Sequence, residues 1–167
     1  LKLENENPGF GKTIHVKCDY RLVVDNLMDL THETFVHGSS IGNDHVAEAP
    51  FDVTHGDKTV TVTRWMRGID APPFWAAQLQ KPGSVDRWQI INFQAPGTVN
   101  IDVGVAPAGT GAPEGDRSQG VNGFVLNTMT PETETTCHYF WAFVRNYRTT
   151  EQKLTTEIRE GVAGIFH

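Results

Sequence analysis

Cysteine is scarce in this sequence: its 167 residues include only Cys18 and Cys137. Because the two lie far apart, neither a disulfide framework nor a cysteine-rich metal site is predicted. No apolar run approaches the length of a membrane span, and the first residues do not resemble a signal peptide. These absences favour a reduced, cytoplasmic domain that does not contact a membrane.

Basic residues are also fewer than acidic ones. The sequence has 14 lysine and arginine residues against 20 aspartate and glutamate residues, a formal net charge of −6. Without a basic cluster, it lacks the electrostatic character of a nucleic-acid-binding protein. Hydrophobic residues make up 38% of the chain, which is ordinary for a globular protein, and a chain of this length can bury a core without disulfides. One globular domain is therefore expected.

Hydrophobic periodicity predicts a helix, a series of strands and a closing helix. The first helix is expected over residues 25–37, with Asp25 as its N-cap and Gly38 at its end. The closing helix follows Thr149 and Gln152, which fit a capping box. Its apolar stripe consists of Leu154, Ile158, Val162 and Ile165. Alternation of apolar and polar residues predicts strands over residues 59–65, 88–93, 98–105, 123–129 and 136–147.

Turn residues separate the predicted strands, among them Ala71-Pro72-Pro73 and Ala95-Pro96-Gly97. Residues 1–13 are interpreted as a linker or lead-in strand, and residues 14–167 as the folded domain. A helix, consecutive antiparallel strands and a second helix predict an α+β fold with helices over one face of the sheet.

The most informative motif places Asn26, Asp29, His32 and His37 in one short segment. Two imidazoles near carboxylates are typical of a redox-active metal site. Five residues at about 100° each place His37 about 140° around a helix from His32, so both can bind one ion only if the helix ends near His37. The alternative is that both histidines lie at a helix end and favour its negative pole. Spacing alone leaves both interpretations open.

Residues 22–32, extended to His37, resemble the mononuclear-iron motif of Rieske non-haem iron oxygenases. The resemblance continues, in order, through residues 85–91, 102–107, 109–115, 130–135 and 138–142. Together these motifs are similar to the oxygenase subunits of vanillate O-demethylase and related monooxygenases, over roughly residues 14 to 167. The resemblance implies a helix-grip (START/Bet v 1-like) catalytic domain, in which an antiparallel sheet packs against helices.

The resemblance also implies a role for each residue of the motif. His32 and His37 would be the histidine ligands of a mononuclear Fe(II), and Asn26 would lie beside the iron. Asp29 would link His32 to a histidine of a 2Fe-2S Rieske cluster on a neighbouring subunit of a homotrimer. The third, carboxylate ligand is expected beyond His167. Because no Cys-x-His pair occurs, the Rieske cluster is expected on a domain absent from this sequence.

The activity implied by the resemblance is O₂ activation at Fe(II). The domain would hydroxylate or O-demethylate an aromatic substrate, specifically a methoxy-aromatic one. The electrons would come from NAD(P)H through a reductase or ferredoxin. Asn127, Asn100 and Asp102 interrupt apolar alternation and are candidates for substrate hydrogen bonding, if they face the space between sheet and helices. The alternative for each is that it faces solvent or ends a strand. A second function remains open, a non-catalytic helix-grip domain that binds a hydrophobic small molecule.

Overall fold

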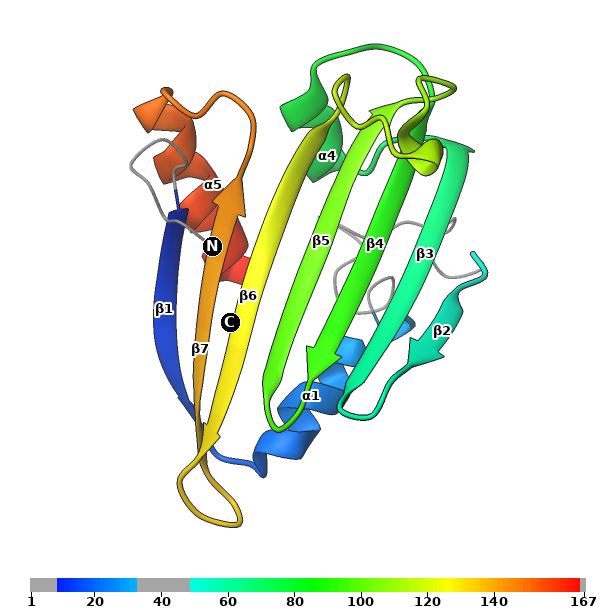
Figure 1. The fold of residues 1–167 in the computed structure, drawn as a ribbon. Helices are drawn as coiled ribbons and strands as arrows, with labels where there is room; N and C mark the ends of the chain where they lie inside the picture. Colours follow the sequence, from blue (N-terminus) through cyan, green and yellow to red (C-terminus); the bar gives the residue numbers. More distant parts are fainter. Residues whose placement is uncertain (1–8, 33–48, 166–167) are drawn as a thin grey trace.

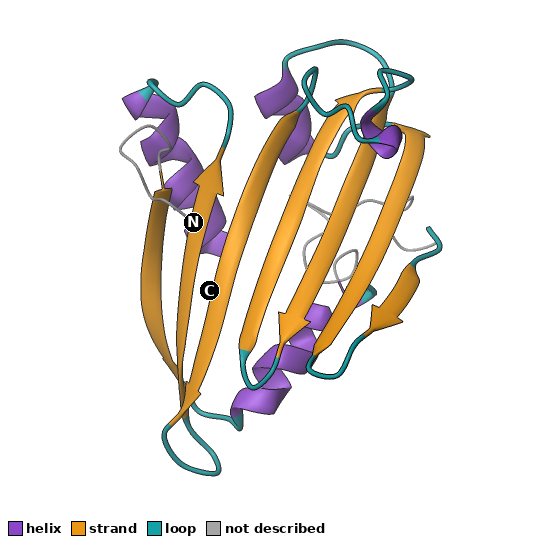
Figure 2. Cartoon of the chain, in the orientation of Figure 1, coloured by secondary structure: helices purple, strands orange, loops and turns teal. Residues whose placement is uncertain are grey.

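The computed structural model describes residues 9–32 and 49–165, and it contains one seven-stranded antiparallel sheet (Figure 1; Figure 2). The strands are β1 (Gly9–Val16), β2 (Asp52–His55), β3 (Thr59–Ile69), β4 (Val85–Gln94), β5 (Thr98–Pro107), β6 (Val121–Pro131) and β7 (Cys137–Arg145). The helices are α1 (Tyr20–Met28), α4 (Pro73–Leu79) and α5 (Gln152–Ile165), with a short 3₁₀ helix η1 (Ala112–Glu114). The predicted α+β, helix-grip class is confirmed.

The strand order is β1-β7-β6-β5-β4-β3-β2, so the strands from β2 to β7 pair with their neighbours along the chain. Each predicted strand is confirmed, and residues 95–97 form the turn between β4 and β5. Residues 9–13 belong to β1, which pairs with β7 along its whole length. The short edge strand β2 and helix α4 are additions to the prediction. The Pro72-Pro73 pair, predicted as a turn, begins α4, because proline fits the first helical position.

The three helices lie on one face of the sheet, behind it in Figure 1. Odd-numbered residues of β5 and β6, such as Val99 and Val125, point toward them and form the main core. The predicted stripe of α5 packs into this core through Leu154, Ile158 and Val162, which are all buried. Each such side chain contributes about 1.5–3 kcal/mol by its burial. None of the helices that the structure describes is long and apolar enough to cross a membrane.

The opposite face, which we call the outer face, carries a smaller core. Trp88 is completely buried there, and its indole lies over Gly104 on the neighbouring strand. A Cβ atom at Gly104 would come within 2.3 Å of the Trp88 ring, so only glycine fits this position. The guanidinium of Arg117 stacks 4.7 Å from the Trp88 ring centroid. The connection between β5 and β6 therefore covers the part of the outer face around Trp88.

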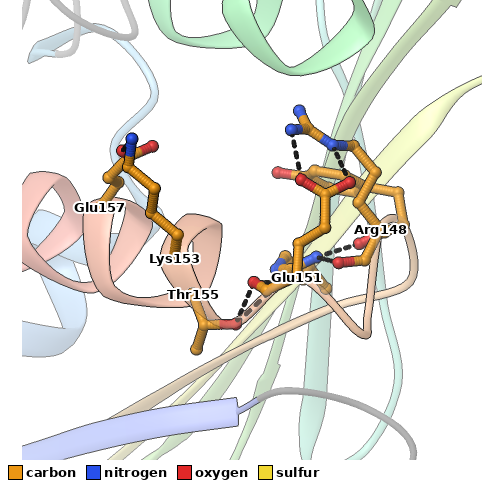
Figure 3. Close-up of polar contacts among 7 residues, drawn as sticks. Arg148, Glu151, Lys153, Thr155 and Glu157 are labelled. Carbon is orange, nitrogen blue, oxygen red and sulfur yellow. Dashed lines mark hydrogen bonds and ion pairs between the residues drawn. The ribbon is translucent and has the colours of Figure 1, made fainter.

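A buried arginine fixes the connection from β7 to α5. The Arg145 guanidinium donates to the carbonyl oxygens of Tyr147, Arg148 and Glu151 and to Oγ1 of Thr155. The Arg148 side chain makes two hydrogen bonds to the Glu151 carboxylate, at 2.7 and 2.6 Å (Figure 3).

The expected capping box at the start of α5 is wrong. The Glu151 carbonyl accepts the first helical hydrogen bond, from the Thr155 N–H at 3.1 Å. Gln152 is therefore the first helical residue, whereas a capping box begun at Thr149 requires Gln152 to be the third.

Candidate metal centre

Helix α1 positions the predicted metal-binding segment, and it begins earlier than expected. Its N-cap is Asp19, whose Oδ1 accepts a hydrogen bond from the Arg21 N–H at 2.9 Å. The Arg21 guanidinium also binds this carboxylate, and these hydrogen bonds lower the pKa of Asp19 to about 2. Asp25, the predicted N-cap, lies inside the helix. The predicted helix over residues 25–37 is therefore wrong in two respects: the helix starts earlier, at Tyr20, and it is interrupted after Met28.

The chain leaves the helical path at Asp29, which has extended backbone angles of φ −80° and ψ 106°. Its N–H still donates to the Asp25 carbonyl at 3.0 Å, so Asp29 is the C-cap of α1. The next residue, Leu30, enters the core. This turn places His32 beyond the end of α1, at a residue that is helical again, so the direction of its side chain does not follow from the register of α1.

His32 is half-buried, and its ring is held by the residue that ends α1. Its Nδ1 lies 2.6 Å from the backbone carbonyl oxygen of Asp29. Because a carbonyl oxygen only accepts, Nδ1 carries the proton, and a neutral imidazole in this tautomer has its lone pair on Nε2. A ring nitrogen that donates to a carbonyl while the other can bind a metal is the usual arrangement of a metal-ligating histidine.

The carboxylate of Asp29 is held by the neighbouring Thr31. Its Oδ1 accepts hydrogen bonds from the N–H and the hydroxyl of Thr31, at 2.7 and 2.6 Å. These bonds, and to a smaller extent the nearby His32 and Arg64, lower the pKa of Asp29. The carboxylate is therefore an ionised, exposed group beside His32, and the main chain of Asp29 makes the contact with the imidazole.

Arg64 of β3 connects this segment to the sheet and was missed by the sequence analysis. It is buried on the helix-facing side, and its Nη1 donates to the Leu30 carbonyl at 3.3 Å. A signal was present, because Arg64 occupies an apolar position in the alternation that includes Val60 and Val62. A charged residue at such a position indicates a specific buried contact.

The other predicted site residues are only partly within the described chain. Asn26 lies exposed in α1, three residues before Asp29. His37 lies outside the described residues, and the expected carboxylate lies beyond His167. Within residues 9–32 and 49–165, no three His, Cys, Asp or Glu side chains form a metal-binding group.

The three candidates for substrate binding lie on different faces of the sheet. Asn127 is fully buried on the helix-facing side, where its Nδ2 donates to the Val99 carbonyl at 3.1 Å. The Tyr139 hydroxyl donates to Asn127 Oδ1 at 2.7 Å. Asn100 and Asp102 lie on the outer face, so the condition set for their substrate role, that they face the space between sheet and helices, is not met at either position.

On the outer face, the Asp102 carboxylate is held by three side chains of the protein itself. Its Oδ1 accepts from Trp88 Nε1 at 2.9 Å and from Asn122 Nδ2 at 2.6 Å. Its Oδ2 pairs with Arg117 at 2.7 Å. The carboxylate therefore organises the smaller core around Trp88.

Comparison with known proteins places the chain in a family. The family model described as the vanillate O-demethylase oxygenase C-terminal domain matches residues 16–167. The chain belongs to this family. It is 47% identical to the vanillate O-demethylase oxygenase subunit of a Pseudomonas species, over 96% of the chain and 51% of that protein. The iron-sulfur subunit TsaM1 of the toluene-4-sulfonate monooxygenase system from Comamonas testosteroni is 38% identical, over 95% of the chain and 46% of that protein.

Dicamba monooxygenase, a solved relative, has the same fold. Its crystal structure with 3,6-dichlorosalicylic acid superimposes with a TM-score of 0.85 at 28% identity, over 96% of this chain and 46% of that one. Another of its crystal structures, with a TM-score of 0.71 at 26% identity over 92% of this chain and 42% of that one, contains non-haem iron and dicamba. The family member described here spans about half the length of the curated relatives that it matches.

Proposed function

We propose that this domain is the catalytic half of a Rieske-type oxygenase. In this proposal, His32 and His37 hold a mononuclear Fe(II), and a carboxylate from beyond His167 completes the ligand set. The contact between His32 Nδ1 and the Asp29 carbonyl supports the proposal most directly, because it sets the tautomer whose Nε2 lone pair is the one suited to a metal ion. When bound, Fe(II) in a site with two histidines and one carboxylate supplies O₂ activation.

The residues around His32 have separate tasks in this proposal. The Asp29 carbonyl and the Arg64 contact to Leu30 orient the imidazole and fix its segment against the sheet. The Asp29 carboxylate, which its hydrogen bonds from Thr31 keep ionised, provides the hydrogen-bonding link toward a 2Fe-2S Rieske cluster of a neighbouring subunit in a homotrimer. Asn26 lies beside the iron. The electrons come from NAD(P)H through a reductase or ferredoxin, in the cytoplasm.

The proposed substrate is an aromatic compound, and the names of the relatives support this class. Hydroxylation of a methoxy methyl group leads to a phenol and formaldehyde, which amounts to O-demethylation. Asn127 is the proposed substrate hydrogen-bonding residue, because it is a buried amide on the helix-facing side of the sheet. The hydroxyl of Tyr139 fixes which way this amide points.

The test is substitution of the histidine in the full-length protein purified without oxygen. The proposal predicts about three irons per chain, two in the cluster and one mononuclear. His32→Ala should lower this to about two and abolish turnover, while the visible spectrum of the cluster stays unchanged. His55→Ala, at an exposed position on β2, is the matched control and should keep all three irons. Full turnover by His32→Ala would refute the proposal.

A further inference from the structure

The outer face of the sheet carries an exposed apolar patch. This β6–β7 patch consists of Phe124, Leu126 and Phe140, whose side chains are 48%, 45% and 42% exposed. Leu126 pairs with Ala142 across the two strands, and Phe140 is two residues from Ala142 on the same face. The three side chains therefore form one continuous surface rather than isolated exposed residues.

On the outer face, the region around Trp88 is covered, whereas the β6–β7 patch is not. Over β3 to β5, Trp88 is buried beneath the β5–β6 connection, with Arg117 stacked on its ring. Among the described residues, no helix lies over β6 and β7 on this face (Figure 1). Contiguous exposed apolar surface of this kind marks an interaction site.

Two observations identify what covers the patch. The matching family model is that of a C-terminal domain, and the chain spans only about half of its curated relatives. The remaining half therefore precedes this domain in those proteins. The first residue of β1, Gly9, pairs with Val144, which in turn pairs with Phe124. Polypeptide that precedes β1 thus enters the sheet two strand spacings, about 10 Å, from the patch.

We propose that the β6–β7 patch is the docking surface for the N-terminal half of the full-length polypeptide. Thr13, Thr128 and Ala142, which lie beside Leu126 and Phe140 on this face, are uncharged. The charged neighbour of Phe124, Asp102, is already paired with Arg117, so the patch has an apolar centre and a polar rim, as a protein interface does. The contacting surface of the N-terminal half is correspondingly apolar. The covalent connection through β1 keeps that half close, so docking occurs within one polypeptide at a high effective concentration.

The experiment measures alkylation rates in the full-length protein. Leu126→Cys tests the patch, and Val53→Cys on β2 is the control, because Val53 is similarly exposed at 54%. Both variants react with N-ethylmaleimide under native conditions, and peptide mass spectrometry reports the rate at each position. The proposal predicts that position 126 reacts at least about ten times more slowly than position 53, at every protein concentration. In denaturant, both positions should react at similar rates.

The possible outcomes separate the occupants. Equal native rates at positions 126 and 53 would overturn the proposal, because the patch would then be open to solvent. The oligomeric state is followed by analytical ultracentrifugation under the same conditions. Protection of position 126 that disappears when the oligomer dissociates into single chains would also overturn the proposal and would assign the patch to a second copy of the chain, whereas protection that persists in the single chain supports it. Phe140→Cys repeats the measurement if Leu126→Cys does not fold. Iron content does not enter the readout, so this result is independent of the proposed function.

Discussion

Substitution of the buried Arg145 tests whether its hydrogen bonds stabilise the connection between β7 and α5. Arg145→Met keeps a long apolar side chain but removes hydrogen bonds to three carbonyls and to the Thr155 hydroxyl. One of these acceptors is buried and three are partly buried. At about 1.5 kcal/mol for the buried acceptor and about 0.5 kcal/mol for each of the others, the free energy of unfolding should fall by about 3 kcal/mol.

Urea denaturation followed by tryptophan fluorescence measures this change. Arg148→Met is the control, because it alters the same turn but removes a pair that lies at the surface, and it should cost much less. In the wild type, burial of the Arg145 guanidinium carries a desolvation cost, which is why its pKa is lowered in the folded protein. Arg145→Met removes this cost together with the hydrogen bonds. If Arg145→Met were as stable as Arg148→Met, that cost would outweigh the hydrogen bonds and the reasoning would be refuted.

Two further predictions concern carboxylates on the outer face. Asp102→Asn should lower the free energy of unfolding by about 2 kcal/mol, as measured by urea denaturation. The reason is that it weakens the charge-assisted contacts to Trp88, Asn122 and Arg117. Unchanged stability together with a raised KM would instead favour a substrate role. Hydrogen bonds from His15 and Thr136 lower the pKa of Glu132 below its ordinary 4.5. Its stabilisation is therefore present above about pH 4.5 and is lost as the pH falls through the lower folded-state pKa. The difference in Tm between the wild type and Glu132→Gln should shrink as the pH falls below 4.5, and a constant difference would contradict this assignment.

The start of the first helix could have been predicted correctly. Tyr20, Val23, Val24 and Leu27 follow the spacing of an amphipathic helix, and Asp19 is as good an N-cap as Asp25. The prediction instead began at Asp25 and ran to His37, although α1 begins at Tyr20 and ends at Met28. The spacing did indicate that Asp29 and His32 lie close together. That the Asp29 carbonyl makes the contact could not be predicted, since it depends on the non-helical backbone of Asp29.

The faces of the substrate-binding candidates were also encoded in the sequence. Val99, Ile101, Val103 and Val105 show that odd-numbered positions of β5 face the core. Asn100 and Asp102 must then lie on the other face, whereas Asn127 shares the parity of the buried Val125. The pairing of β1 with β7 has no such signal, because hydrophobic alternation defines the faces of a strand but not its neighbour.

The β1–β7 pairing has a consequence for how the domain folds as it is synthesised. Strands β2 to β7 can pair as successive local hairpins, whereas the bond between His15 and Glu132 joins residues 117 positions apart. Closure of so long a loop carries a larger entropic cost and slows the formation of the contact. Because the ribosome makes β1 before β7, β1 must wait for its partner strand. Until residues 137–145 emerge, β1 is an open strand edge, which makes the nascent chain prone to aggregation.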